Sequence, residues 1–234
     1  MPLSSTEFTP SSSNGRTMAA DAIPDAIPTR ARRKQARPAE LLQAATQLFV
    51  HKGYAATRVE EVAQMAHVSK GTLFLYYPSK AALLEAVVRE NLVGHFAQWQ
   101  QELEAFSGST EALIRHAFEV WRTRIVKSTA GGVCKLLTQE CGNFPELGNF
   151  YLREVVQPGH ALVRRILQRG VERKEFRPLD LDACVHLILS PMFYFNHWQH
   201  TLAPHFPLSL GVDEDAFFDA QVDNLLRGLR APAA

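Results

Sequence analysis

The segment VSKGTLFLYYPSK, residues 68–80, decides how the rest of the chain is interpreted. By residue propensity alone, its run from Leu73 to Tyr77 favours a buried β-strand. A Ser-Lys pair comes before this run, Pro78 ends it, and a second Ser-Lys pair follows. Ser69 is a favoured N-cap residue, and the residue before a proline is pushed out of the α region. We therefore predict a helix of about two turns that ends before Pro78.

The sequence before this segment has helical spacing, which overrides the β propensity. From Pro38 to the stop residue Gly53, apolar residues recur with the period of one helix face. These residues are Leu41, Leu42, Ala45, Leu48 and Phe49. Thr57 and Glu60 then stand in the T-x-x-E pattern of a capping box. The pattern predicts a short second helix over about residues 58–66.

The sequence after the segment also predicts helices. Ser79 is a favoured N-cap for a fourth helix, whose apolar spacing continues to roughly residue 105. The remaining helices are predicted over residues 110–127, 131–141, 145–173, 180–203 and 213–229. Because no strand-turn-strand pattern competes with them, the predicted fold class is all-α.

Composition limits the class of protein. The chain has 234 residues, of which 46% are hydrophobic and 21% charged, as in ordinary globular proteins. Cys134, Cys141 and Cys184 form no CxxC pair, which favours a reducing compartment. No apolar run approaches the roughly 18 to 20 residues of a membrane span, and the first 30 residues lack a signal-peptide block. We expect a cytoplasmic protein with no membrane partner.

Charge is divided unevenly along the chain. Residues 30–80 carry nine basic and three acidic side chains, whereas residues 81–234 carry 15 basic and 18 acidic ones. The basic block suggests a polyanion partner, although a solvated charged face explains it equally well. Residues 1–35 are rich in Ser, Pro and Ala and lack periodicity, so we expect a disordered extension. Its basic end, residues 30–37, is either an arm that contacts DNA or a solvated linker.

Two short helices joined by a tight turn form a helix-turn-helix, whose second helix enters the DNA major groove by its N-terminal end. Lys70 offers positive charge to a phosphate or a guanine edge, and Thr72 offers a hydroxyl. Gly71 costs about 1 kcal/mol relative to alanine inside a helix, which favours close approach of its backbone to a partner.

The aromatic residues of the same helix divide into two faces. Leu73 and Tyr77, at i and i+4, are predicted to pack on the preceding helices. Phe74 and Tyr76 then lie partly outward, where apolar contacts to thymine methyls and a hydrogen bond to phosphate are available. Lys80 is expected to supply a second phosphate contact at the start of the next helix. The alternative is that the aromatic residues form a small core and the lysines are solvated.

The sequence from residue 53 to residue 88, GYAATRVEEVAQMAHVSKGTLFLYYPSKAALLEAVV, resembles the DNA-binding domain of the tetracycline-repressor (TetR) family of bacterial regulators. Residues that match the family pattern include Gly53, Val68, Gly71, Tyr77 and Leu83. The resemblance implies DNA contacts from Thr57, Ser69, Lys70, Gly71, Thr72, Tyr76 and Lys80. Phe74 stands where the family often has tyrosine, so a hydroxyl contact to the DNA backbone is absent. Leu75 is less polar than the family's common residue, which leaves the base preference at that position open.

The resemblance also implies a domain organisation. A helix-turn-helix DNA-binding domain is expected over residues 36–84, followed by a helical ligand-binding and dimerisation domain over residues 85–234. Within the latter, Phe218, Val222, Leu225 and Leu229 are spaced like a coiled-coil stripe. This stripe predicts either a dimer interface across a two-fold axis or ordinary core within one chain.

Aromatic and sulfur side chains near residues 190–200 suggest a pocket for a lipophilic small molecule, with plain core as the alternative. The predicted lining residues are Phe118, Trp121, Tyr151, Met192 and Phe195. Histidines in the same part of the chain lack the HExxH spacing of catalytic zinc helices. With no phosphate-loop, dinucleotide or nucleophile-elbow motif either, we predict no catalytic residue, no metal site and no cofactor.

Together these patterns predict a homodimeric repressor that binds a palindromic DNA operator and is released by a small-molecule ligand. One alternative is a DNA-binding dimer without a ligand. The alternative of a different class is a helical protein that binds a ligand or a metal.

Overall fold

The structure is a computed structural model that describes residues 30–206 and 213–231. The chain divides into two compact units, residues 1–35 and 36–234, and the helical fold is that of the second. Most of the extension that we expect to be disordered lies outside the described residues. Its last residues, 30–35, are part of the first helix.

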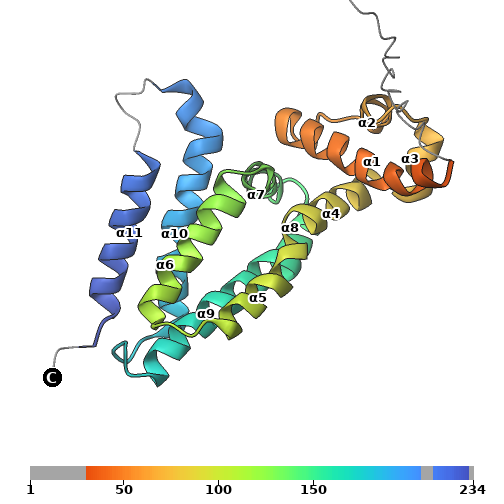
Figure 1. The fold of residues 1–234 in the computed structure, drawn as a ribbon. Coiled ribbons are helices and arrows are strands. Elements are labelled where there is room, and N and C mark those ends of the chain that lie inside the picture. The colour runs from red at the N-terminus through yellow and green to blue at the C-terminus, as the bar shows by residue number, and fades with distance from the viewer. Residues whose placement is uncertain (1–29, 207–212, 232–234) are drawn as a thin grey trace, which may run out of the picture. The chain divides into compact units, whose positions relative to one another are not determined.

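In the first part of the fold, a long helix is followed by two short helices and a longer one, joined by tight turns (Figure 1). These helices are α1 (Arg30–Lys52), α2 (Val59–Met65), α3 (Lys70–Tyr76) and α4 (Lys80–Asn91). The sequence signals for the end of α1 and for the starts of α3 and α4 are confirmed. Gly53 follows α1 with φ +86°, a backbone conformation that favours glycine. Ser69 and Ser79 cap α3 and α4 by accepting hydrogen bonds from the backbone N–H groups of Thr72 and Ala82.

The capping box predicted for α2 is wrong by one residue. Arg58, not Thr57, is the N-cap, and the Glu61 carboxylate accepts a hydrogen bond from the Arg58 backbone N–H at 3.1 Å. Thr57 is 2% exposed, and its hydroxyl donates to the carbonyl groups of Gly53 and Leu48 at 2.7 and 3.2 Å. Its side chain therefore holds the α1–α2 turn together.

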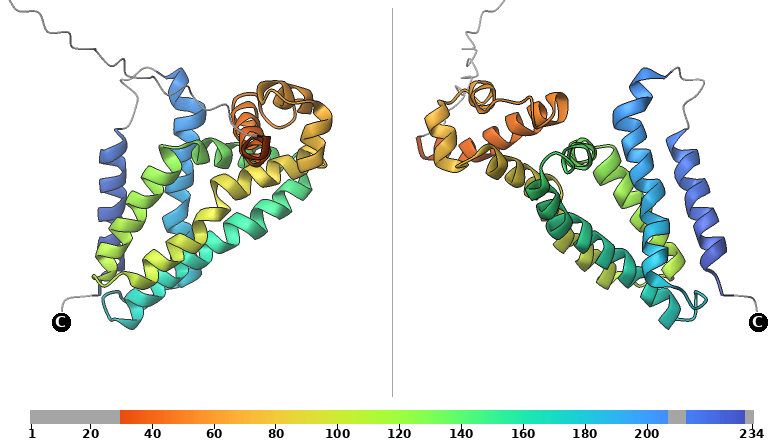
Figure 2. Two further views of the ribbon diagram at one scale, coloured as in Figure 1. Left: turned by 45° about the vertical axis from the view of Figure 1, so that its right-hand side comes forward. Right: turned by 180° about the vertical axis from the view of Figure 1, so that it is seen from behind.

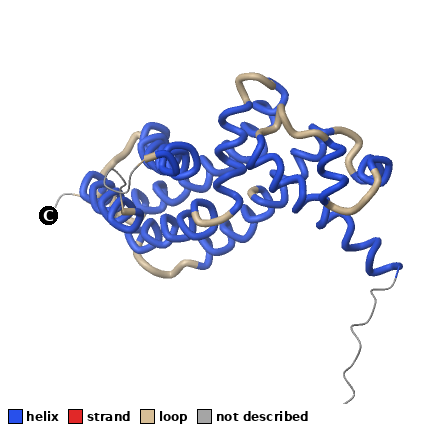
Figure 3. Tube along the Cα trace, turned by 90° about the horizontal axis from the view of Figure 1, so that it is seen from above, coloured by secondary structure: helices blue, strands red, loops and turns tan. Residues whose placement is uncertain are grey.

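The second part of the fold continues as helices throughout. They are α5 (Phe96–Ala105), α6 (Thr110–Trp121), α7 (Thr129–Glu140), α8 (Pro145–Tyr151), α9 (Gln157–Glu172), α10 (Leu181–His197) and α11 (Glu214–Leu229). Figure 3 shows helices and loops only, and among the described residues the β structure is limited to an isolated bridge between Phe176 and Arg230. The all-α prediction is confirmed.

Irregular turns interrupt the helices where the sequence predicts continuous ones. A 3-10 turn at Val93–His95 separates α4 from α5, and another at Ala203–His205 follows α10. Segments of π-helix cover Arg122–Val126, Leu152–Val156 and Trp198–Leu202. Such π segments are rare and are often found at functional sites.

The buried side chains form two clusters. The first joins the helix-turn-helix to α7 and α8 and includes Phe49, Leu73 and Leu137. The second lies between α6, α9, α10 and α11 and includes Leu167 and Phe195. Since α4 contributes Leu83, Leu84, Val87 and Val88 to the first cluster, the helix-turn-helix shares its core with the neighbouring helices.

Helix α11 packs alongside α6 and α10 (Figure 2). Phe218, Val222 and Leu229 are each at most 5% exposed within the one chain. The apolar stripe of α11, for which we predict either a dimer interface or ordinary core, is therefore core, because its side chains are buried against α6 and α10. Leu225, the fourth residue of the stripe, is partly buried against the same cluster.

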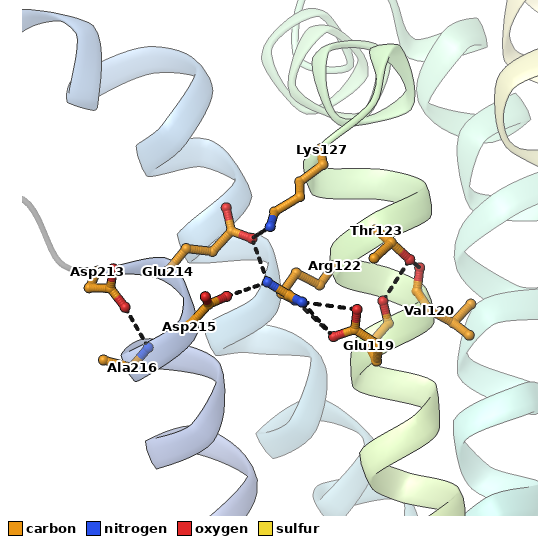
Figure 4. Close-up of polar contacts among 9 residues, drawn as sticks. All are labelled: Glu119, Val120, Arg122, Thr123, Lys127, Asp213, Glu214, Asp215 and Ala216. Atoms are coloured by element: carbon orange, nitrogen blue, oxygen red, sulfur yellow. Dashed lines mark hydrogen bonds and ion pairs between the residues drawn. The ribbon is translucent and has the colours of Figure 1, made fainter.

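Ion pairs hold the first turn of α11 to the end of α6 (Figure 4). The Arg122 guanidinium lies between Glu119 and the carboxylates of Glu214 and Asp215. Lys127 adds a contact of 3.1 Å to Glu214. Since Arg122 and Glu214 are only 18% and 20% exposed, the pair between them is shielded more than an ordinary surface pair, whereas Glu119 and Asp215 are more than half exposed.

Candidate functional site

The turn between α2 and α3 sets the direction of α3. His67 has φ 53°, in the left-handed region, and the Val68 backbone N–H donates to the Ala63 carbonyl at 2.9 Å. Ser69 then begins α3, with its hydroxyl 2.8 Å from that of Thr72. These bonds fix the start of a helix whose N-terminal residues are exposed.

Most of the residues predicted to contact DNA lie on this helix. Ser69, Lys70, Gly71 and Phe74 are exposed, while Thr72 and Tyr76 are partly buried. Leu75 is 84% exposed, the highest value among the exposed large apolar side chains of the described residues. The exposed Leu75, Lys70 and Gly71 thus form a surface of α3 that does not pack against the core of the chain.

Gly71 is not required by packing inside the chain. A Cβ placed there would meet, among the described atoms, only the Ser69 hydroxyl at an ordinary distance of 3.7 Å. Alanine would fit and would favour the helix by about 1 kcal/mol. The absence of an internal reason agrees with the predicted close approach of a partner to this backbone.

Lys70 has an internal ion pair. Its Nζ lies 2.5 Å from a Glu60 carboxylate oxygen of α2 and 5.7 Å from the centre of the Phe74 ring. The hydrogen bond from Lys70 holds the pKa of Glu60 below its ordinary value. Both side chains are more than half exposed, so the pair stabilises the fold little.

The structure does not bring Thr57 to this surface, and it gives Lys80 an internal position. Lys80 Nζ donates to the Ala55 carbonyl at 3.1 Å and lies 4.5 Å from the centre of the Tyr54 ring. Burial lowers the pKa of Lys80. The side chain therefore ties the start of α4 to the α1–α2 turn, and its phosphate contact stays a prediction.

The same turn is held from the other side by α7. One oxygen of Glu140, at the end of α7, accepts hydrogen bonds from the backbone N–H groups of Tyr54 at 2.9 Å and Ala55 at 3.3 Å. The Tyr54 ring also meets Phe144 edge to face, with centres 4.9 Å apart. Glu140 and Lys80 thus both bind the α1–α2 turn. The sequence does not indicate the contact between α7 and this turn, because a carboxylate at the end of a helix is usually solvated.

A cavity of about 160 Å³ lies among α5, α6, α9 and α10 and the π segments between helices. Phe118, Trp121, Tyr151 and Met192 line it, so the structure brings together four of the five predicted pocket residues. Its wall also includes Phe96, Trp99, Leu103, Ile114, Ile125, Val155 and Ile188. Sequence reasoning missed Phe96 and Trp99 because their spacing is that of any core helix.

Phe195, the fifth predicted pocket residue, does not line the cavity. Its ring stacks on Phe217 of α11, with centres 4.5 Å apart, and meets Phe218 edge to face. The residue is 2% exposed and faces α11 rather than the cavity. Its position on α10 fits a core role.

One acidic group stands at the wall of this apolar cavity. Glu102 accepts hydrogen bonds from Arg124 at 3.0 Å and lies 4.0 Å from His116. Burial acts to raise the pKa of Glu102, but the hydrogen bonds from Arg124 and Gln98 outweigh it and the net shift is downward. The carboxylate is thus charged and already paired.

Groups for other chemistries are not assembled in the described part of the chain. Residues 30–206 and 213–231 contain no cluster of three or more His, Cys, Asp or Glu side chains that could hold a metal ion. In the same residues, no helix has both the length and the apolarity to cross a membrane.

Comparison with known proteins agrees with this geometry. Residues 41–87 match the family model of bacterial regulatory proteins of the tetR family, and residues 106–207 match the model of tetracyclin repressor-like C-terminal domains. The chain belongs to the TetR family of transcriptional regulators. The first match covers the helix-turn-helix, and the second covers α6 to α10 of this TetR-family regulator.

Relatives of this TetR-family chain are regulators. The HTH-type transcriptional repressor KstR2 of Mycolicibacterium smegmatis is 28% identical over 167 residues, covering 68% of this chain and 77% of the relative. The uncharacterized HTH-type regulator YdeS of Bacillus subtilis is 28% identical over 155 residues, covering 66% and 75%. The fold resembles that of the regulator FadR of Bacillus subtilis in complex with stearoyl-CoA, with TM-score 0.68, 16% identity and coverage of 81% and 98%.

Proposed function

We propose that the chain is a homodimeric repressor that binds a palindromic operator through α3 and is released by a small lipophilic effector. The observation that carries the proposal is the exposed surface of α3, where Lys70 and Gly71 at its start and Leu75 near its end are exposed without any internal requirement for glycine at position 71. A capped helix that presents small, basic and apolar groups fits the major groove.

An effector is supported by the cavity. Its volume of about 160 Å³ is close to the roughly 150 Å³ of an apolar cavity that holds benzene. The buried part of the effector is therefore about the size of one ring or a short branched chain. The FadR relative binds an acyl-CoA, and KstR2 is named a repressor, which supports an effector-released repressor of the same family.

Coupling between cavity and DNA is proposed to run through Glu140. Helix α7 contributes Cys134 to the cavity wall and Glu140 to the turn at Tyr54 and Ala55. Lys80 of α4 contacts the same turn. A shift of α7 on effector binding would thus move α4 and the helix-turn-helix together, provided that the effector binds the two states with different affinity.

The dimer is proposed to form through α9 and α10. On α10, Leu187 is 67% exposed and Tyr194 is 60% exposed, one on each side of Ser190 and seven residues apart on one face. Exposed apolar side chains that line up on a helix mark an interaction surface. A palindromic operator requires the two α3 helices of the dimer to lie one helical turn of DNA apart, about 34 to 36 Å.

The experiment that tests the proposal is selection of genomic DNA fragments by the purified full chain. The comparison variant is Lys70→Ala/Leu75→Ala, whose side chains are exposed and whose loss should not unfold the protein. A matched control is Asn224→Ala/Arg227→Ala on the exposed face of α11. Enrichment of a palindromic site by the wild type and the control, and its loss in the α3 variant, is the expected result. No enrichment at low salt from a folded dimer would exclude the DNA-binding function.

A further inference from the structure

Two buried hydrogen-bond donors at the cavity wall have no partner. Tyr151 is 6% exposed, and neither its hydroxyl nor the Trp99 indole N–H has a hydrogen-bond partner among the described residues. Both side chains line the cavity. Buried polar groups in native proteins are nearly always satisfied, and an unmade hydrogen bond is costly, so each such donor needs an explanation.

The surroundings of Tyr151 keep its hydroxyl a donor. Burial raises the pKa of Tyr151 well above its ordinary value, and the neighbouring thiols of Cys134 and Cys141 act in the same direction. Burial also raises the pKa of Cys134 to about 12. These neighbouring thiols are therefore neutral, and the phenol stays protonated, which leaves the cavity with a neutral donor.

The described wall of the cavity provides no lysine or arginine to pair with an anion. Its one carboxylate, Glu102, is already paired with Arg124. Of the two described lining histidines, His116 lies 4.0 Å from the Glu102 carboxylate, and His160 has its pKa lowered by burial and by His186, which disfavours its charged form. A buried carboxylate would lose its hydration here without gaining an ion pair.

We propose that the effector is a neutral, mainly apolar molecule with one hydrogen-bond acceptor, such as a ketone, ester or amide carbonyl, that binds the Tyr151 hydroxyl. Trp99 provides a second donor in the same cavity. The inference rests on the proposed effector role of this cavity and adds the chemical class of the effector. Tyr151 thereby selects a carbonyl compound over both the matching hydrocarbon and the matching carboxylate.

The test uses three molecules of nearly equal shape: acetophenone, ethylbenzene and benzoate. Isothermal titration calorimetry on the full chain gives a dissociation constant for each, for the wild type and for Tyr151→Phe. The quantity of interest is the ratio of the ethylbenzene constant to the acetophenone constant, because comparing it between variants cancels the different hydrophobicity of the two ligands. One hydrogen bond predicts that the ratio falls about 5-fold in Tyr151→Phe.

Matched variants separate the binding role from a change in folding. Tyr151→Phe removes a hydroxyl that bonds nothing described, so its melting temperature should equal or exceed that of the wild type. Asn224→Ala, an exposed change on α11 away from the cavity wall, should leave the ratio unaltered. Trp99→Phe should reduce acetophenone affinity while ethylbenzene affinity changes less.

The outcomes distinguish this inference from the proposed function. A ratio that falls in Tyr151→Phe, with benzoate unbound at concentrations that saturate with acetophenone, supports the inference. If acetophenone and ethylbenzene both bind and the ratio is the same in both proteins, or if benzoate binds as tightly as acetophenone, the neutral-acceptor inference is overturned and the cavity remains an effector site. If neither acetophenone nor ethylbenzene binds, the effector role of the cavity falls with it, while DNA binding is judged separately by the selection experiment.

Discussion

Lys70 joins the fold and the proposed function in one side chain. In the structure its ammonium pairs with Glu60, yet both groups are more than half exposed and the pair is worth little. DNA phosphates offer many negative charges at the same surface, and neutralising them releases counterions. The ion pair therefore positions the Lys70 side chain but is weak enough for Lys70 to leave Glu60 and bind a phosphate.

Replacing Lys70 tests this exchange. In Lys70→Ala, the slope of log affinity against log salt concentration should fall by about 1 if Lys70 neutralises one phosphate. Glu60→Gln should instead strengthen DNA binding, because it frees Lys70 and removes a carboxylate near the phosphates. Fluorescence anisotropy on the selected operator at several salt concentrations measures both effects. Arg227→Ala, which removes a positive charge elsewhere on the surface, is the control and should leave the slope unchanged. If Lys70→Ala also leaves the slope and the affinity unchanged, Lys70 does not contact the DNA.

At the residue scale, the sequence predicted α3 and its caps well. Ser69 and Ser79 bond the backbone as expected, and Gly53 takes the positive φ that its position required. The role of Thr57 was harder to predict. A threonine just before a helix fits the pattern of an N-cap whether its hydroxyl bonds the first turn of that helix or the residues before it. Here it bonds backward to the Gly53 carbonyl.

Helix α7 is the element that connects the two proposed sites. It carries cavity residue Cys134 near its middle and Glu140 at its end, where the carboxylate receives two backbone hydrogen bonds from the α1–α2 turn. A helix is stiff over this length, so movement at one point is transmitted to the other.

Removing the Glu140 carboxylate should uncouple the sites. In Glu140→Ala, we expect the affinity for the effector probe to stay near the wild-type value while the effector-induced loss of operator affinity shrinks. Coupling energies of this kind are typically about 1 to 3 kcal/mol, which corresponds to about 5- to 150-fold in operator affinity. Operator binding with and without saturating probe measures the change. Gln139→Ala, the exposed neighbour on α7, is the control. Full coupling in Glu140→Ala would argue against this route.

The attachment of α11 gives a second prediction for an element. Arg122→Gln removes the ion pairs that Arg122 makes with Glu214 and Asp215 in the first turn of α11, while the Lys127–Glu214 pair and the Arg115–Asp223 pair further along stay intact. We expect faster backbone hydrogen exchange in the first turn of α11 and less change near its C-terminal end. Mass spectrometry of exchanged peptides measures this. Arg164→Gln, which breaks the exposed pair with Asp182, should leave α11 unaffected, and uniform exchange along α11 in Arg122→Gln would contradict local anchoring.

Apolar spacing predicts where the helices lie, but it does not predict where a helix becomes irregular. The π segments at Arg122–Val126 and Leu152–Val156 have the same apolar pattern as the α-helices they interrupt. They differ only in which carbonyl each N–H meets, which packing decides. Because both segments supply cavity residues, the shape of the cavity could not be derived from the sequence.

At the scale of the whole molecule, the structure decides which of the two predicted roles the apolar stripe of α11 has. Periodicity identified the apolar stripe of α11 but could not name its partner, since the same spacing serves an intramolecular core. In the structure, the side chains of that stripe pack against α6 and α10, whereas Leu187 and Tyr194 of α10 are exposed.

Charges placed on the exposed face of α10 should separate the proposed dimer. Leu187→Glu/Tyr194→Glu introduces two negative charges on each copy, and an interface that meets its own image across a two-fold axis brings them together. We expect a monomer by light scattering coupled to gel filtration, with weakened operator binding because two linked reading helices become one. Ala220→Glu, exposed on α11, should stay dimeric. An unchanged mass for the double variant would move the interface elsewhere.

The cavity of about 160 Å³ has a further consequence, which concerns hydrostatic pressure. Unfolding eliminates internal voids, so compression favours the unfolded chain in proportion to the empty space that the fold encloses. A molecule bound in the cavity fills part of this space and reduces the volume change. The midpoint pressure of unfolding should therefore rise with occupancy, which gives a measure of effector binding that needs neither DNA nor a labelled ligand.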